Sequence, residues 1–328
     1  MKGLRVVLGI AISTALLAVL LWSVDLHQLA AQLARTRWGW TLLAVVLAPL
    51  GLWVRARRWR YLFPPRSEPP GLIPAIMIGY MANNLLPLRA GEVVRVYVVA
   101  RRWGRGFWTA LATLVVERVL DSLAIVLLLG VLVLLIPVPP IFRWTAITLL
   151  AIDAAAVTAL AILATAPSAC THLVGRLTRP WPGLAERAWR ILDRFVQGLD
   201  GIRTPAHALP LLGWTILIWV VPALAAWTML RALDIDVPLI AGWTVLAFVG
   251  LGVSIPSAPG FVGVFHYAAV LALEIFDVPR SASLGYALLF HATQVIPITL
   301  VGWLFLLREQ MSLGEATRAR PAPTASEA

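Results

Sequence analysis

Six apolar runs, each about as long as a membrane-spanning helix, constrain this chain more than any other feature of its sequence. An α-helix rises about 1.5 Å per residue, so about 20 apolar residues cross the hydrocarbon core of a bilayer, which is about 30 Å thick. The backbone of each run must satisfy its own hydrogen bonds in lipid, so we predict an all-α polytopic membrane protein. The runs cover residues 6–24, 38–54, 107–136, 144–166, 209–230 and 282–307.

The composition agrees with this class and excludes several others. Of the residues, 60% are hydrophobic and 13% are charged, and the mean hydropathy is +0.85. The net charge of +11 comes from short arginine runs beside the apolar segments, which is typical of membrane topology signals and not of a nucleic-acid surface. The single cysteine, Cys170, offers neither a disulfide nor a metal cluster, and we expect no cofactor.

The charges that flank residues 71–100 predict a first re-entrant hairpin. Positive residues near membrane spans mark the cytoplasmic side, so both ends of this segment should be cytoplasmic. It must therefore cross the membrane an even number of times, yet it is too short and too broken for two full spans. We expect it to enter from the cytoplasm and to turn near Asn83–Pro87. The flanking charges are Arg55, Arg57, Arg58, Arg60 and Arg66 before the segment, and Arg101, Arg102 and Arg105 after it.

Residues 239–276 predict a second hairpin, entered from the opposite side. The sequence "SIPSAPGFVG" (254–263) breaks the helix in the middle of this segment. The order span, hairpin, span then occurs twice, over 38–136 and 209–307, as in inverted-topology repeats. The alternative is that 239–254 and 260–276 are complete crossings, which gives eight transmembrane helices. Both topologies place the two termini in the cytoplasm.

Around these elements we expect one transmembrane domain over residues 1–308. The first run is read as a retained span and not as a signal peptide, because it is about 19 residues long and has no clear cleavage site. Residues 167–208 form a cytoplasmic loop, in which 184–202 have the pattern of an amphipathic helix lying at the membrane interface. Residues 309–328 are polar and are expected to form a disordered cytoplasmic tail.

Charged residues occur in the first hairpin and in the span that follows it. Pro87 suits a helix start, so Arg89, Glu92 and Arg95 would follow along one helical stripe. An arginine beside a buried helix N-terminus is a good receptor for phosphate, and Asn83 and Asn84 could add donors. The next span carries Glu117, Arg118 and Asp121, which could pair with the charges of the hairpin. A purely structural charge network explains these residues equally well.

The second hairpin and the last span contain further polar candidates. The glycines and prolines of the second hairpin break helices and let backbone approach a ligand. The histidines and the glutamine could serve proton coupling, headgroup contact or structure alone. These candidates are Ser257, Pro259, Gly260, Gly263 and His266 in the hairpin, and His291 and Gln294 in the last span.

Three sequence blocks resemble the signatures of a known family. "NNLLPLRAGEVVRVYVVARRWG" begins at Asn83, "ATLVVERVLDSLA" at Ala112 and "IPSAPGFVGVFHYAAVLAL" at Ile255. They are similar to the lysylphosphatidylglycerol synthase transmembrane-region family, the flippase-like domain also found in multiple peptide resistance factor proteins. The resemblance covers about residues 4–308. It implies site residues at Asn84, Pro87, Arg89, Gly91, Glu92 and Arg95, at Glu117, Arg118 and Asp121, and at Pro259, Gly260 and Gly263.

Two positions depart from the family pattern. His266 stands where a glutamate is frequent, and His291 stands where an arginine is frequent. The chain as given also has no soluble aminoacyl-transferase domain, so we do not expect it to synthesise lysylphosphatidylglycerol by itself.

The resemblance and the polar residues together favour a lipid flippase or lipid-binding transporter in a bacterial or archaeal cell membrane. Its ligand would be an anionic, modified or polyprenyl-phosphate lipid, with the headgroup held between the two hairpins. A second hypothesis is a non-transporting partner of a separate lipid synthase or glycosyltransferase. A third is an intramembrane lipid-modifying enzyme, although no nucleophile with an adjacent base supports it. We therefore expect membrane lipids as partners, no nucleic acid and no enzymatic activity.

Overall fold

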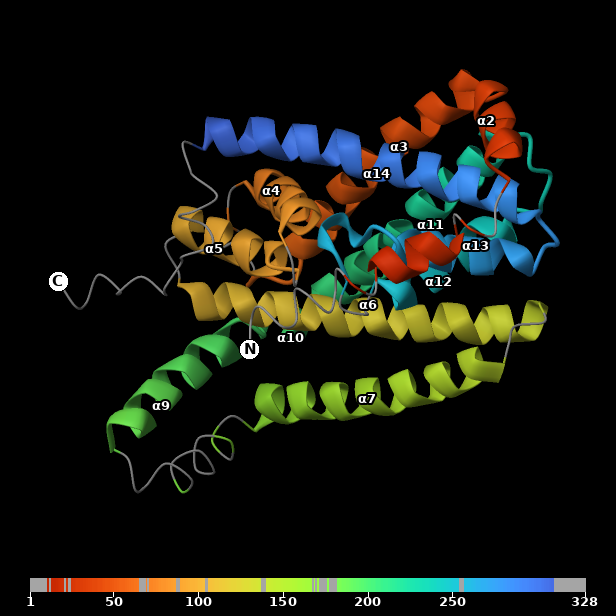
Figure 1. The fold of residues 1–328 in the computed structure, drawn as a ribbon. Coiled ribbons are helices and arrows are strands. Elements are labelled where there is room, and N and C mark those ends of the chain that lie inside the picture. Colours follow the sequence, from red (N-terminus) through yellow and green to blue (C-terminus); the bar gives the residue numbers. More distant parts are fainter. Residues whose placement is uncertain are drawn as a thin grey trace.

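In the described part of the 328-residue chain, every regular element of secondary structure is a helix and no strand occurs. The computed structural model describes residues 11, 13–20, 22, 25–64, 69, 71–86, 89–103, 106–136, 140–166, 168, 170, 176, 182–253 and 257–309. Figure 1 shows the long helices over residues 107–135, 140–165 and 280–308 lying with their axes in roughly one direction. The predicted all-α polytopic architecture is confirmed.

Five helices of the described chain are long and apolar enough to cross a membrane. They correspond to five of the six predicted runs, while the first run, residues 6–24, lies partly outside the described residues. The helices are α3 (Trp38–Arg60), α6 (Phe107–Leu135), α7 (Pro140–Thr165), α11 (Ala208–Ala232) and α14 (Arg280–Arg308).

The two interrupted segments fold as pairs of short helices. The first pair is α4 (Leu72–Leu85) and α5 (Gly91–Trp103). The second is α12 (Ile240–Gly252) and α13 (Val264–Glu274), joined through the short 3-10 helix η2 (Pro259–Phe261). Helices of this length rise about 15–20 Å, well short of the hydrocarbon core of about 30 Å. This favours two re-entrant hairpins over the alternative of eight complete crossings.

The turns at the two tips differ from the sequence prediction. We expected helix to resume directly after Pro87, which would place Arg89 on the stripe of Glu92 and Arg95. Instead Arg89 lies in a turn with φ of 53°, and α5 begins at Gly91, so that part of the prediction is wrong. Pro87 itself lies outside the described residues. In the second hairpin the long helix begins at Val264 and not near Phe261, because Gly260, Phe261 and Gly263 all have positive φ.

The packing of the helices has the pattern of an inverted repeat. Exchanging α3, α4, α5 and α6 with α11, α12, α13 and α14 maps most of the contacts of one half onto those of the other. The contact of α4 with α14 corresponds to that of α12 with α6, and α5 with α6 corresponds to α13 with α14. Helices α3 and α11, which exchange with each other, pack together extensively. The tips of the two hairpins meet between the halves, where η2 contacts α4.

A close glycine contact holds the first hairpin together. A Cβ atom on Gly91 would collide with the carbonyl oxygen of Gly79, and one on Gly79 would collide with the side chain of Arg95. The backbones of α4 and α5 therefore approach each other closely at this crossing. This contact fixes the face of α5 that carries Glu92 and Arg95.

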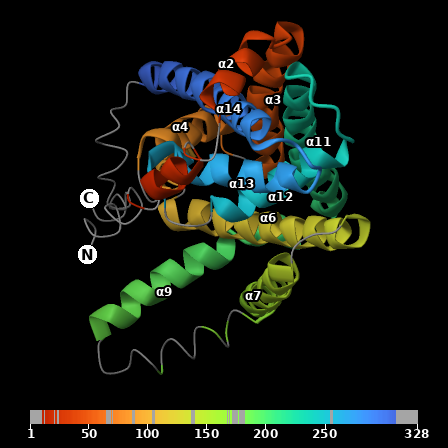
Figure 2. The same cartoon turned by 45° about the vertical axis from the view of Figure 1, so that its right-hand side comes forward.

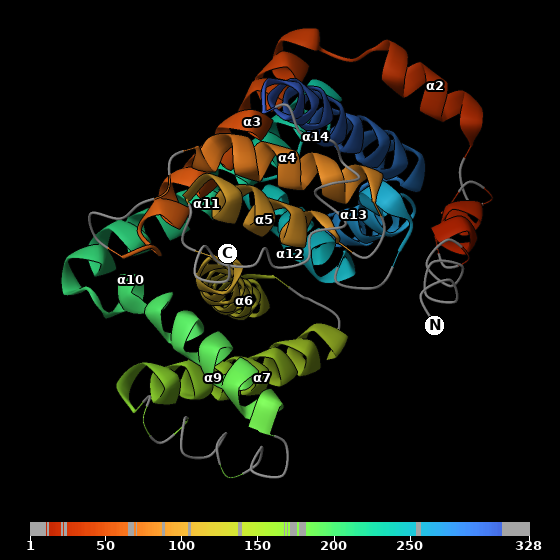
Figure 3. The ribbon, with the colours of Figure 1, turned by 90° about the vertical axis from the view of Figure 1, so that its left-hand side faces the viewer.

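The remaining helices surround this core. Helix α2 (Leu26–Ala34) packs on α14, while the Ser13 hydroxyl accepts a hydrogen bond of 2.9 Å from the N–H of Ala258 in the second hairpin. Helix α9 (Pro182–Gln197) contacts α6 and supplies most of the predicted amphipathic segment. It leads through α10 (Asp200–Arg203) and η1 (Pro205–His207) into α11. Figures 2 and 3 show α7 and α9 on one side of α6, away from α3, α4 and α14.

Candidate functional site

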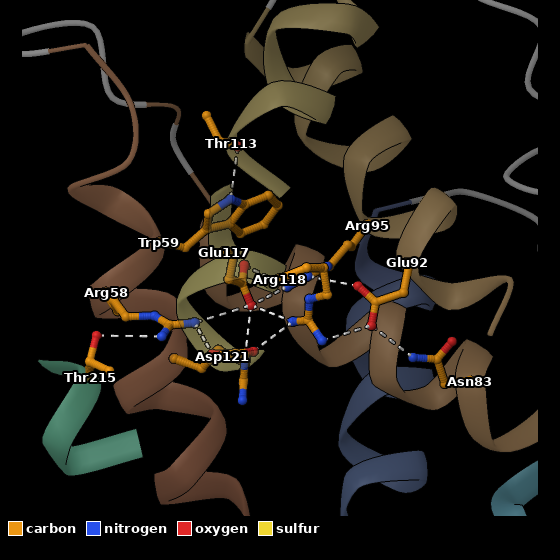
Figure 4. Close-up of polar contacts among 11 residues, drawn as sticks. Arg58, Trp59, Asn83, Glu92, Arg95, Thr113, Glu117, Arg118, Asp121 and Thr215 are labelled. Carbon is orange, nitrogen blue, oxygen red and sulfur yellow. Dashed lines mark hydrogen bonds and ion pairs between the residues drawn. The ribbon is translucent and has the colours of Figure 1, made fainter. Parts of the chain in front are cut away.

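Three carboxylates and several arginines form one cluster where α3, α5 and α6 meet. Glu117 is at its centre and is fully buried. One of its oxygens, Oε1, lies 2.8 Å from Nη1 of Arg55 and 2.7 Å from Nη2 of Arg118. The other, Oε2, lies 3.1 Å from Nη1 of Arg95. Figure 4 shows the arginine side chains pointing toward this carboxylate from different helices.

Asp121 and Glu92 extend the cluster on either side of Glu117. Asp121 lies 2.6 Å from Arg55, 2.5 Å from Arg58 and 3.2 Å from Arg118. Glu92 lies 2.7 Å from Arg95 and 3.7 Å from Arg118, and it accepts a 3.5 Å hydrogen bond from the side-chain amide of Asn83. The predicted pairings of Arg95 with Glu117 and of Glu92 with Arg118 are therefore present.

Helical spacing explains why these side chains meet. Glu117 and Asp121 are four residues apart on α6 and therefore share a face, as do Glu92 and Arg95, three apart on α5. Arg55 and Arg58 are likewise three apart on α3. From the sequence alone these two arginines are interpreted only as topology signals, whereas the structure directs both side chains into the cluster. Helix α3 continues to Arg60, and its inner face carries both side chains into the cluster, where Arg58 has no exposed surface.

A cavity of about 840 Å³ opens beside this cluster, between the two hairpins. Arg55, Arg118 and Asp121 line it from the charged side, whereas Phe248, Val264 and other apolar residues line it from the second half. Figure 4 shows Arg118 between Glu117, Asp121 and Glu92. The other polar lining residues are Tyr80, Asn83, Asn84, Arg89, Glu92, Ser122, Thr145 and Tyr267.

Arg89 joins the two hairpin tips across this cavity. Its Nη2 donates a hydrogen bond of 2.8 Å to the carbonyl oxygen of Val253, and its guanidinium lies 5.6 Å from the centre of the Phe261 ring. Within the described part of the chain Arg89 forms no ion pair. Its neighbour Asn84 donates a hydrogen bond of 2.9 Å to the hydroxyl of Thr299 on α14.

The cluster and Arg89 together carry a positive charge that their carboxylates do not balance. The cluster and Arg89 contain five arginines and three carboxylates, which leaves two positive charges in excess among the described residues. The arginines are Arg55, Arg58, Arg89, Arg95 and Arg118. A charge inside a bilayer costs about 2.5–3.5 kcal/mol even on the gentler insertion scale. Three of these arginines and two of the carboxylates line the cavity, which leaves an excess of one positive charge in the lining and favours occupation by an anion.

The cavity separates the predicted residues into two groups. Asn83, Asn84, Arg89 and Glu92 line it, whereas Arg95 and Gly91 are buried behind its wall. Arg95 instead stacks over the ring of Trp59, 5.0 Å from its centre, and so holds the cluster in place.

The predicted residues of the second hairpin mainly shape its tip. His291 donates from Nε2 to the carbonyl oxygen of Gly260 over 2.7 Å, and the N–H of Gly263 donates to Nδ1 of His266 over 3.2 Å. The two imidazole rings meet edge to face with 4.8 Å between their centres. A Cβ on Gly263 would collide with the backbone of Ser13. Both histidines are thus hydrogen-bonded to the backbone of the tip and contact each other.

The other candidates of this half lie away from the cavity lining. Ser257 and Pro259 belong to the tip but do not line the cavity, and the side-chain amide nitrogen of Gln294 is buried without a hydrogen-bond partner. No group of three or more His, Cys, Asp or Glu side chains that could hold a metal ion occurs among the residues whose placement is described.

The fold and the site define a class: a polytopic membrane domain in which two hairpins of short helices enclose a cavity lined by arginines. Comparison with known proteins agrees. Residues 6–302 match the model of the family described as "Lysylphosphatidylglycerol synthase TM region", and the chain belongs to this family. The resemblance seen in the three sequence blocks is thereby confirmed.

A curated relative extends this comparison. The chain is 28% identical over 338 aligned positions to the "Glycosyltransferase AglD" of Haloferax volcanii. The alignment covers 92% of this chain and 54% of that protein, so the chain spans about half the length of this relative. Among solved structures no match was found.

Proposed function

We propose that this chain binds the anionic headgroup of a membrane lipid in the cavity between its hairpins and moves the lipid between the two leaflets. The observation that carries this proposal is the unbalanced positive charge of the arginines at the cavity. A phosphate group would supply the missing negative charge at membrane depth, where few other anions are available. Membership of a family with a flippase-like membrane region supports the same function.

The chemistry of the lining suits a phosphate-bearing headgroup. Guanidinium groups bind phosphate through paired, charge-assisted hydrogen bonds, and Arg89 and Arg118 both reach the cavity. Tyr80 and Asn84 offer neutral donors beside them. Glu92 and Asp121 could accept hydrogen bonds from the hydroxyl or amino groups of a modified headgroup. Anionic, modified and polyprenyl-phosphate lipids all carry a group of this kind.

The inverted packing of the two halves supports transport, and not only binding. The cavity lies where the hairpin tips meet, and one hairpin comes from each half. Rocking of one half against the other could expose the cavity first to one side and then to the other. Proton coupling through His266 and His291 is not part of this proposal, because both rings already hold the tip of the second hairpin.

Flipping by purified protein in liposomes tests the proposal. Fluorescent phosphatidylglycerol should cross faster with protein than without it. Arg89→Ala should reduce the rate about tenfold or more, because a hydrogen bond to a charged group contributes about 1.5–3 kcal/mol. Arg89 is the cleanest position because its removal breaks none of the described ion pairs.

Arg57→Ala is the matched control for this experiment. Arg57 lies on the exposed face of α3 and stacks over Trp53, away from the cavity. The Arg57→Ala protein should flip lipid at the wild-type rate. Equal rates for wild type and Arg89→Ala, with both proteins folded and inserted, would contradict the headgroup site.

A partnership with a lipid-linked glycosyltransferase is a second candidate. It is favoured by the similarity to AglD, which is named a glycosyltransferase and is about twice as long as the matched region. In this version the chain presents a lipid to an enzyme and does not itself transport it. Retention of lipid without flipping, together with co-purification of a glycosyltransferase from native membranes, would support this candidate over transport. Neither version assigns a catalytic step to the chain.

A further inference from the structure

A second hollow of the molecule, which we call the tail groove, lies between α6 and α11. It has a volume of about 880 Å³, and its walls are almost entirely apolar. Leu123 and Leu127 of α6, Leu212 and Ile216 of α11 and Trp243 of α12 line it. Leu127 and Leu212 are both more than half exposed, so the groove opens toward the surroundings of the helix bundle and not into its core.

The tail groove adjoins the cationic cavity. Trp219 lines both hollows and therefore stands at their junction. Helix α6 separates them, because Leu120 faces the groove while Asp121 and Ser122 face the cavity. Thr215 in the groove wall lies 3.5 Å from Nη1 of Arg58, which in turn pairs with Asp121. A molecule with a charged end and an apolar end could therefore occupy both hollows at once.

Trp219 supplies a second, independent indication of a ligand. Its indole Nε1 atom is buried and has no hydrogen-bond partner. A buried donor without a partner costs about 1–3 kcal/mol. A ligand oxygen at the junction of the two hollows would remove this cost.

The tail groove is long enough for a hydrocarbon chain of a lipid. On α6 it extends from Leu120 to Leu132, and twelve steps along a helix rise about 18 Å. Half of a hydrocarbon core of about 30 Å is about 15 Å. The lining also reaches Ile202 and Leu239, so the groove has room for a single hydrocarbon chain that starts near Trp219.

We propose that the tail groove holds a hydrocarbon chain of the same lipid whose headgroup occupies the cationic cavity. In this arrangement the indole N–H of Trp219 donates a hydrogen bond to an oxygen where headgroup and chain join. The inference rests on the proposed function and deepens it, because it makes the chain region of the lipid part of what the protein recognises.

Photo-crosslinking tests this inference directly. The probe is phosphatidylglycerol with a diazirine in the outer part of one acyl chain, in liposomes that contain the full protein. Adducts found by peptide mass spectrometry should concentrate in residues 120–132 and 211–219. A phosphatidylcholine probe with the same chain should label these segments several-fold less. Equal labelling by both probes over all lipid-facing helices would overturn the proposal.

Two variants sharpen the test. Leu127→Trp should fill the groove and reduce both chain adducts and flipping about fivefold or more. Leu134→Trp is its control, because Leu134 is 85% exposed on the same helix and does not line the groove. Trp219→Phe keeps an aromatic ring but removes the N–H donor. It should reduce the yield of probe adducts more than the control Leu134→Trp does. Wild-type capture in both Leu127→Trp and Trp219→Phe would overturn the tail groove.

The two proposals fail in different ways. If Arg89→Ala stops flipping while Leu127→Trp and Trp219→Phe do not, the headgroup site stands and the tail groove is wrong. If Arg89→Ala leaves both flipping and capture unchanged, the headgroup site itself is wrong, and the tail groove falls with it.

Discussion

At the scale of single residues, the cluster around Glu117 shows how arginines at membrane depth are stabilised. Each carboxylate contacts at least two guanidinium groups, and Glu117 and Arg58 have no exposed surface. Such a network is held by mutual neutralisation, because each charge alone would be costly in a bilayer. Removal of one member therefore leaves several uncompensated partners.

We expect Glu117→Gln to destabilise the protein strongly although it keeps the size of the side chain. The change leaves Arg55, Arg95 and Arg118 close together without their shared carboxylate, and breaking a buried ion pair costs about 3–5 kcal/mol. Thermal unfolding in detergent, followed by tryptophan fluorescence, should show a clearly lower melting temperature. Glu186→Gln is the control, because this side chain is 78% exposed and surface changes are usually within about 0.5 kcal/mol. Equal melting temperatures for the two variants would show that the cluster contributes little to stability.

The arginines also show where sequence reasoning reached its limit. Arg89, Glu92, Arg95, Glu117 and their neighbours stood out because they interrupt apolar sequence. Arg55 and Arg58 did not, since they belong to a run of arginines at the end of an apolar segment, which is typical of a topology signal. The spacing of three residues was the available signal, because it separates an inward pair from the outward Arg57 and Arg60.

At the scale of elements, the two hairpins were predictable because charge counting and helix-breaking residues both pointed to them. The conformations of the hairpin tips were less predictable. A left-handed turn at Arg89 is unusual for a residue with a side chain, and its conformation depends on contacts with the other hairpin that the sequence does not show. The crossing at Gly79 and Gly91 likewise depends on how α4 meets α5. The sequence marks the glycines but does not say what they approach.

We expect Gly91→Leu to disrupt the first hairpin. Any Cβ at this position collides with the Gly79 backbone, so the helices must separate and the ion pair of Glu92 and Arg95 moves with them. Overpacking of this kind costs about 1–3 kcal/mol or more, and flipping should fall together with the melting temperature. Gly130→Leu on α6 is the matched control, because a Cβ there meets no atom within 4 Å. Wild-type stability of Gly91→Leu would mean that the crossing is looser than described.

At the scale of the whole molecule, the predicted topology makes the two faces of the membrane distinguishable. Asp236 belongs to the loop expected outside the cell, and Glu186 belongs to the loop expected in the cytoplasm. Both side chains are well exposed, at 93% and 78%. In a Cys170→Ser background, a membrane-impermeant maleimide added to intact cells should label Asp236→Cys but not Glu186→Cys. Labelling of Glu186→Cys alone would invert the orientation, and labelling of both or neither would contradict the assignment of these loops to opposite sides.

The two halves of the molecule are alike in pattern but not in their openings. When the helices of the first half are exchanged with their counterparts in the second half, the pair α6 and α11 corresponds to the pair α14 and α3. Helices α3 and α14 pack together extensively, whereas α6 and α11 contact each other over a shorter stretch, beside the tail groove. In an inverted repeat, the two halves can adopt two different conformations. When the halves exchange these conformations, the molecule changes from one overall state to the other, so an asymmetry of this kind is expected in each state. Under the proposed transport mechanism, this structure would be the state that opens between α6 and α11, and the second state should open between α3 and α14.

Distances between spin labels can reveal both states. One pair of labels, at Leu134 of α6 and Leu224 of α11, reports on the open side, and a second pair, at Arg57 of α3 and Leu307 of α14, reports on the closed side. All four side chains are exposed, and Cys170 would be replaced by serine. We expect two populations for each pair, separated by about 5 Å or more, the scale of one helical turn. Added phosphatidylglycerol should shift the two pairs in opposite directions, because one opening closes as the other opens. Single, unchanged distances for both pairs would mean that the asymmetry is permanent, and the chain would then bind lipid without alternating access.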